Sequence, residues 1–190
     1  MNTYQLVSVI RALILYFPLG YQILKSPVTQ NLATFILWGS LDAIAGASMI
    51  AQGSGNYQLP FAYVLGCVIV IACVLKSGKY SWTRVETAIS ILVLVCITAW
   101  LVIVWVFHNP WLATVLSTTG VVLAGAPQIR DSWRKPEESP FMIYVGFTFV
   151  NVLSVMGGAS WTAEERLYSG SCTILCGLVT AISARKFSRQ

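Results

Sequence analysis

Long apolar runs, separated by short polar breaks, occupy nearly the whole chain. A helix needs about 20 residues to cross about 30 Å of hydrocarbon. A segment that faces lipid must also satisfy its own backbone hydrogen bonds, which favours helices. We therefore predict an all-α membrane protein with seven transmembrane helices, at residues 3–24, 29–51, 59–76, 84–107, 110–131, 140–161 and 164–185.

The composition excludes a soluble domain. Only 10% of the 190 residues are charged, whereas a soluble domain carries about 25%. All five cysteines lie inside apolar runs and no CxxC pair occurs. We therefore expect them to be packing residues rather than disulfides or metal ligands.

The basic residues predict the orientation. When loops are numbered from an outside N-terminus, ten of the twelve lysines and arginines fall in the inner loops and the C-terminal tail. The outer loops hold only Arg166, and Arg11 lies inside the first run. The positive-inside rule then places the N-terminus outside and the C-terminus in the cytoplasm. We favour the plasma (inner) membrane over an organelle, with anionic headgroups as partners of the net charge of +5.

Two hairpins of the chain repeat one pattern. Four positions of the first coincide with four of the second: Gln22 with Gln128, Ile23 with Ile129, Trp38 with Phe147, and Asp42 with Asn151. Internal duplication in a membrane protein is typical of transporters. We predict two parallel three-helix repeats joined by a linker helix (3+1+3), with domains at residues 1–80, 81–108 and 109–190.

Pro127-Gln128 stands near the inner end of the fifth run and is followed by a basic loop. With the 3+1+3 organisation, this motif makes the chain resemble the PQ-loop and SWEET (MtN3-like) superfamily of seven-helix transporters. The resemblance is carried mainly by residues 120–151 and more weakly by 15–42, where Pro18 precedes Tyr21-Gln22. It implies transport, although members differ in cargo. The asparagines that sugar-transporting members place on their third and seventh helices do not occur here.

Asp42 is the only acidic residue well inside a predicted span. An ionisable group at that depth is a functional candidate, and Trp38 lies one turn before it on the same face. With Phe147 and Asn151 at the matching places of the second repeat, these four are the predicted substrate-binding residues. The alternative is that Asp42 and Asn151 simply bond neighbouring helices.

Arg11 lies at the same predicted depth as Asp42 and carries the opposite charge. We predict that the two form a coupling ion pair, because a paired charge costs less in the membrane than a single one. The alternative is that Arg11 extends outward to the headgroups.

The prolines predict hinges. A proline inside a helix removes one backbone hydrogen bond and bends the helix. Pro18 with Gln22, and Pro127 with Gln128, are therefore the predicted hinges of the two repeats. A static kink that lets helices pack is the alternative.

These features predict a transporter that moves a small polar solute by alternating access. An amino-acid-like cargo is favoured, and coupling to a proton through Asp42 is an option. A sugar facilitator of the SWEET type is one alternative, and a receptor or scaffold that binds a peptide or lipid without moving it is another. The sequence holds no nucleophile–base set, so we expect no enzyme. We also expect no cofactor, no metal and no nucleic acid. The expected partners are the solute and the lipid bilayer, and a homo-oligomer is left open.

Overall fold

The computed structural model describes residues 2–25, 30–78, 80–81, 84–134, 136 and 139–188. These residues are helical apart from turns and a parallel pair of two-residue strands, β1 (Gln30–Asn31) and β2 (Tyr80–Ser81). The helices are α1 (Thr3–Lys25), α2 (Leu32–Ala51), α3 (Gln58–Ser77), α4 (Arg84–Leu101), α5 (Pro110–Ala124), α6 (Ala126–Arg134), α7 (Phe141–Gly157) and α8 (Ala163–Ser183). A π-helical segment, η1 (Val102–Val106), extends α4, and a 3-10 segment, η2 (Ala184–Ser188), extends α8. The predicted all-α class is confirmed.

Several helices have the length and polarity of membrane spans. Within the described residues, four segments are long and apolar enough to cross a membrane: Thr3–Lys25, Gln58–Ser77, Pro110–Arg134 and Ala163–Phe187. Three shorter apolar helices accompany them: Phe35–Ala51, Leu94–Val106 and Phe141–Gly157. Their outward side chains are large and apolar, for example Phe17, Leu94 and Ile174. These features fit an integral membrane protein.

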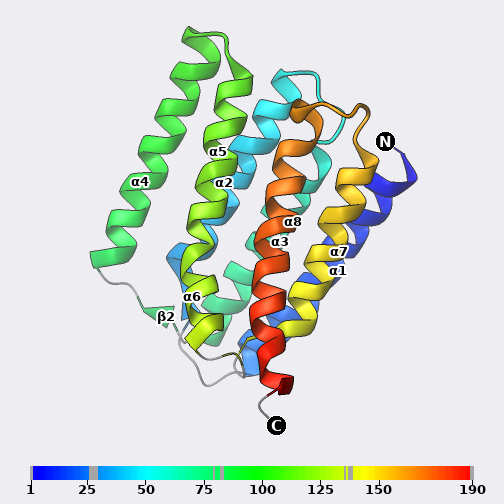
Figure 1. The fold of residues 1–190 in the computed structure, drawn as a ribbon. Helices are drawn as coiled ribbons and strands as arrows, with labels where there is room; N and C mark the ends of the chain where they lie inside the picture. The colour runs from blue at the N-terminus through cyan, green and yellow to red at the C-terminus, as the bar shows by residue number, and fades with distance from the viewer. Residues whose placement is uncertain are drawn as a thin grey trace.

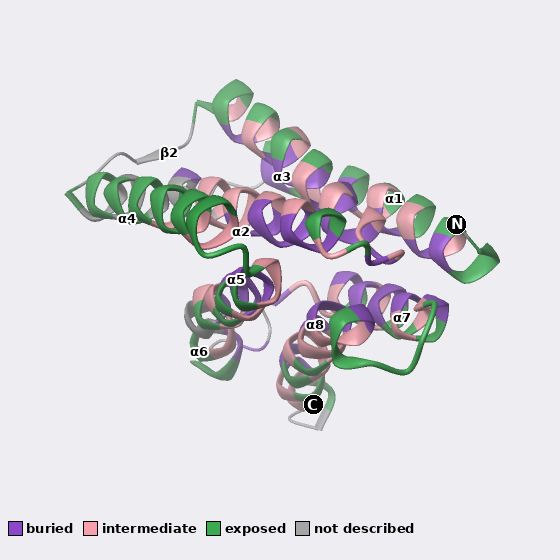
Figure 2. Cartoon of the chain, turned by 90° about the horizontal axis from the view of Figure 1, so that it is seen from above, coloured by how far each residue is buried: buried purple, intermediate pink, exposed green. Residues whose placement is uncertain are grey.

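The helices stand in two rows, seen from above in Figure 2. In the first row α3 packs against both α1 and α2, and in the second α8 packs against both α5 and α7. The rows meet where α1 contacts α7 and where α2 contacts α5, while α4 packs against α2. The two termini lie at opposite ends of the bundle (Figure 1).

The start of α5 follows from local sequence. The Asn109 side chain caps the helix by accepting a hydrogen bond from the backbone N–H of Leu112, at 3.0 Å. Pro110 occupies the first turn, where the missing N–H costs nothing.

The predicted fifth span, 110–131, is divided near its C-terminal end. Helix α5 ends at Ala124 and α6 begins at Ala126, with a turn at Gly125 between them. Pro127 has no N–H to donate to the carbonyl four residues earlier, which explains a break at this point. Gly125 also leaves room for the Leu175 side chain of α8, since a Cβ there would lie 2.7 Å from its methyl carbons. Pro18, by contrast, lies within an unbroken α1.

A close approach of α1 and α3 depends on Gly66. The ring of Tyr16, from α1, packs against the backbone of Gly66, and a Cβ at that position would overlap the ring. Tyr16 is therefore seated in the interior, where it is 8% exposed.

We expect Gly66→Ala to lower the free energy of unfolding by about 1–3 kcal/mol, because the Tyr16 ring has to move. Thermal unfolding of the purified protein in detergent measures the effect. Gly170→Ala is the matched control, since nothing lies within 4 Å of a Cβ there; it should be neutral or slightly stabilising. Equal melting temperatures for the two variants would contradict the tight contact.

Candidate functional site

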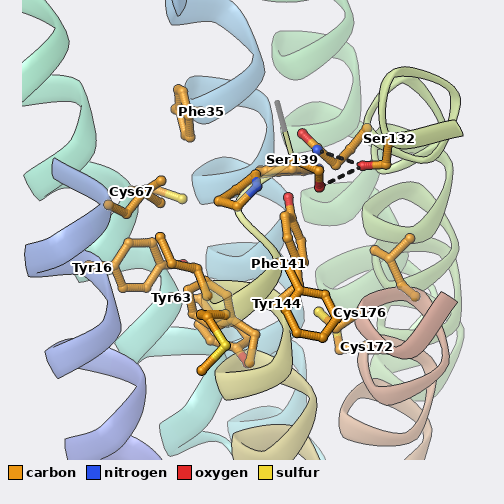
Figure 3. A pocket seen from close by; sticks show the side chains of 18 of the residues that line it. Tyr16, Phe35, Tyr63, Cys67, Ser132, Ser139, Phe141, Tyr144, Cys172 and Cys176 are labelled. Atoms are coloured by element: carbon orange, nitrogen blue, oxygen red, sulfur yellow. Dashed lines mark hydrogen bonds between the residues drawn. The ribbon is translucent and has the colours of Figure 1, made fainter. Parts of the chain in front are cut away.

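A cavity of about 980 Å³ lies between the two rows of helices. Residues of α1, α2, α3, α5, α6, α7, α8 and η2 line it. It begins among Ser132, Ser139 and Lys186, at the end of the bundle where α7 starts and the chain ends, and it reaches Asp42 in the middle of α2. Figure 3 shows the serine end and the cluster that contains Tyr16 and Tyr63 at opposite sides of this cavity.

Asp42 is buried at the inner end of the cavity, with 4% of its surface exposed. The Tyr168 hydroxyl donates a hydrogen bond to Asp42 Oδ1 at 2.6 Å, which joins α8 of the second row to α2 of the first. Among the described lining residues the other charged group is Lys186, at the far end of the cavity. The carboxyl of Asp42 therefore faces a cavity whose inner part holds no described cation.

Aromatic rings surround the space next to Asp42. Tyr16, Tyr63 and Phe147 come from three helices and pack edge to face, with ring centroids 5.2 to 6.3 Å apart. Tyr168 adds a fourth ring, 6.5 Å from Tyr63. Such pairs stabilise the contact beyond their buried area, so the inner end of the cavity has a defined aromatic wall.

Three cysteines also face the cavity. Cys67 of α3 and Cys172 and Cys176 of α8 line it as free thiols. Cys67 and Cys172 are buried and Cys176 is half-buried, so these predicted packing residues also form part of the cavity wall. Within the described residues, no group of three or more His, Cys, Asp or Glu side chains is arranged to hold a metal ion.

The opposite end of the bundle is held together by buried polar groups from both rows. Asn56 Nδ2 donates to the backbone carbonyls of Ser154, at 3.1 Å, and Glu165, at 2.9 Å. Ser154 Oγ donates to Asn56 Oδ1 at 3.1 Å and shares a 2.7 Å hydrogen bond with Ser169 Oγ. The Glu165 carboxylate accepts the backbone N–H of Gly55 at 2.9 Å. We call Asn56, Ser154, Glu165 and Ser169 the outer network; it joins the segment before α3 to α7 and α8.

Most of the predicted site residues meet in the cavity. Trp38, Asp42 and Phe147 line its inner part, and Gln22 and Gln128 line it nearer the serine end. Trp38 Nε1 is buried without a hydrogen-bond partner among the described residues.

Asn151 has a different position from the one we predicted. It is fully buried, its Nδ2 donates to the carbonyl of Phe147 on its own helix at 2.8 Å, and it is not among the described residues that line the cavity. Tyr63 Oη and Asn151 Oδ1 are both buried without a hydrogen-bond partner among the described residues. Asn151 Nδ2 also lies 3.9 Å from Cys176 Sγ on α8, so Asn151 packs between α7 and α8.

The predicted ion pair of Arg11 with Asp42 is wrong. Arg11 is exposed, and its guanidinium carbon lies 5.5 Å from the ring centroid of Phe149 on the outer side of α7. The interior position belongs to Ala12, about 100° further round the helix. Equal depth in two helices therefore did not imply that the two side chains share a face, and the extension of Arg11 to the headgroups stays a prediction.

The hinge predictions remain predictions. Pro18 is exposed on α1, and Pro127 belongs to α6, although its side chain lies outside the described residues. Gln128 Nε2 donates to Ser132 Oγ at 3.2 Å, so the second motif is joined to the serine end of the cavity.

Sequence reasoning missed the tyrosines and thiols of the cavity wall. A signal was present, because Tyr63 and Cys67 are four residues apart and Tyr168, Cys172 and Cys176 follow the same spacing. Residues spaced by four share one helix face. What the spacing does not tell is which face points at Asp42.

Comparisons of the chain with protein-family models, with curated proteins and with solved structures gave no match.

Proposed function

We propose that the protein is a membrane transporter that moves a small solute by alternating access through the cavity around Asp42. The observation that carries the proposal is an asymmetry. A cavity reaches the buried carboxyl from one end of the bundle, while the outer network joins the two helix rows at the other end. This is the arrangement that a transporter needs in one of its two end states.

The helix contacts support a 3+1+3 organisation. If α5 with α6, α7 and α8 correspond to α1, α2 and α3, then α3 and α8 are both the middle helix of their row. The contact of α1 with α7 and that of α2 with α5 are then equivalent. Such reciprocal contacts are expected for parallel repeats related by an axis along the membrane normal. Helix α4 is the linker, and a PQ-loop or SWEET relationship is part of the proposal.

Basic residues support an orientation with the cavity open to the cytoplasm. Lys25, Lys76, Arg134 and Lys186 stand at the helix ends near the serine end of the cavity, which lie together in Figure 1. Arg166 stands at the other end, near the start of α8. Under the positive-inside rule, the serine end faces the cytoplasm and the outer network faces outside.

The helix break at Gly125 supports movement at the cytoplasmic end. Helix α6 is separated from α5 by this break and carries Gln128 and Ser132 on the cavity wall. We propose that α6 and the inner end of α1, after Pro18, close the cavity while the outer network opens. Asp42 would couple that exchange to a proton.

Reconstituted liposomes test the function. We expect a panel of zwitterionic, sugar and cationic solutes, tested with and without a pH gradient, to contain a solute that enters protein-containing liposomes and exchanges with its unlabelled form. Protein-free liposomes of the same lipids are the control. Binding of a panel member without entry of any of them would favour the receptor or scaffold alternative.

A further inference from the structure

The groups around Asp42 restrict what can neutralise its charge. Its titratable neighbours on the packed helices are phenols and thiols, namely Tyr16, Tyr63, Cys67, Tyr168, Cys172 and Cys176. Helix α5, which packs against α2 where the two rows meet, carries no charged residue. Helix α4 also packs against α2, and its Arg84 is exposed at the first position of that helix. Phenols and thiols stabilise a carboxylate by hydrogen bonds but do not balance its charge.

An ionised carboxylate without a partner is costly at this depth of a membrane protein. Removing one member of a buried charge pair has a cost of the same origin, since the remaining charge is poorly solvated. With Arg11 turned outward, the described residues that line the cavity next to Asp42 include no cation, because Lys186 lies at the far end. The partner of Asp42 must therefore come through the cavity, either as a proton or as a cation.

The wall beside Asp42 is suited to an organic cation. Tyr16, Tyr63, Phe147 and Tyr168 surround the space, and Trp38 lies one helical turn from Asp42 on α2. The faces of aromatic rings attract ammonium groups, and sites that bind quaternary ammonium ions are built from such rings. The Trp38 N–H, which has no hydrogen-bond partner among the described residues, adds a donor for an oxygen of the ligand.

We propose that the cargo is a small organic cation, a quaternary or protonated amine, which binds among these rings and displaces a proton from Asp42. The inference rests on the proposed transport function and specifies its cargo. The exchange balances: the O–H bond of the carboxylic acid breaks, its proton leaves through the cavity to water, and the cation takes its place as the counter-charge. Transport is then an exchange of one cation for one proton.

A zwitterion fits this site less well. Its carboxylate needs a cationic partner, and the charged group that the described lining offers is Lys186, eighteen residues after Tyr168. At 1.5 Å per residue this separation is about 27 Å, which exceeds the length of an amino acid. The amino-acid-like cargo favoured from the sequence is therefore replaced by a cation in this proposal.

Three solutes with the same bulky head test the charge requirement. Choline is a cation, glycine betaine is a zwitterion, and 3,3-dimethylbutan-1-ol is the neutral carbon counterpart of choline. We expect calorimetry on the purified protein to show choline binding about tenfold or more tighter than either of the others. In weakly buffered solution, choline binding should release up to about one proton per chain.

Variants separate the site from the fold. Asp42→Asn should weaken choline binding about tenfold or more and abolish proton release, while its melting temperature stays close to that of the wild type. Glu164→Gln is the matched control, because it removes one acidic charge from an exposed position, and it should bind choline and release the proton normally.

The outcomes distinguish the cargo from the function. Equal binding of the three solutes, or normal choline binding by Asp42→Asn, would overturn the cation site. If choline binds through Asp42 but does not cross reconstituted membranes, the cation site is supported and transport is wrong. If another solute is transported and choline does not bind, the transporter is supported and the cation assignment is overturned.

Discussion

Replacing Asp42 with asparagine should reduce proton-driven accumulation of the cargo by about 100-fold or more. Asparagine keeps the shape of the side chain, and its Oδ1 still accepts the hydrogen bond from Tyr168, which is 2.6 Å long in the wild type. The amide carries neither a charge nor an exchangeable proton at this position. The variant therefore loses the group that we propose to alternate between proton and cation, while folding is preserved because a buried ionisable group disappears.

Liposomes with an acidic interior measure this effect. In the wild type, protons leaving through the protein should drive labelled cation inward, and in Asp42→Asn the internal label should not exceed the external concentration. Tyr168→Phe keeps the carboxyl and removes the donor, so it should show an intermediate loss. Accumulation by Asp42→Asn at the wild-type level would contradict the coupling role. Retained exchange of the labelled cation without accumulation would show that Asp42 couples the proton but is not the counter-charge of the cargo.

The fold class was predictable because one physical requirement governs it. Apolar runs near 20 residues must be helical in lipid, and breaks such as Asn109-Pro110 end or start helices for local reasons. The division of the fifth predicted span into α5 and α6 at Gly125 was harder to predict from the sequence. It depends on Pro127 together with the close approach of Leu175 from α8, which is a tertiary contact.

Residues on one helix face were predicted better than contacts between helices. Trp38 and Asp42 are one helical turn apart on the same face, so when one of them lines the cavity the other does as well. Arg11 was misplaced because depth along a helix says nothing of rotation about its axis. Asn151 was placed by its alignment with Asp42, and that correspondence does not determine which side chains surround it. Arg11 points to Phe149, and Asn151 packs between α7 and α8.

The outer network was not predictable from single spans. From the sequence alone, Asn56 belongs to a polar turn between two spans. Ser154 and Ser169 have the pattern of small residues inside apolar helices. Their roles arise only when the two rows meet, because each group satisfies a partner from the other row. Buried polar groups of this kind have to be paired, so their partners are set by tertiary structure.

The outer network leads to the second large effect. Asn56→Ala should shift the protein toward a conformation that is open to the outside. The Asn56 amide is 1% exposed and takes part in hydrogen bonds with Ser154 and the backbone carbonyl of Glu165. In the outward-open conformation that we propose, water would replace these bonds, so the network would stabilise the outward-closed state selectively. At about 1 kcal/mol for each of three bonds, the equilibrium should move by about 100-fold.

Thiol labelling detects the shift. In a variant whose only cysteine is Cys172, on the cavity wall, a membrane-impermeant reagent applied outside should label the Asn56→Ala protein at least about tenfold faster. Ser160→Ala, at an exposed position of the loop between α7 and α8, should label as slowly as its parent. The same reagent applied from the cytoplasmic side should react more slowly with Asn56→Ala than with the parent, because opening one end closes the other. Faster labelling from both sides would indicate a loosened bundle, and unchanged labelling from outside would show that the outer network does not hold the outer end closed.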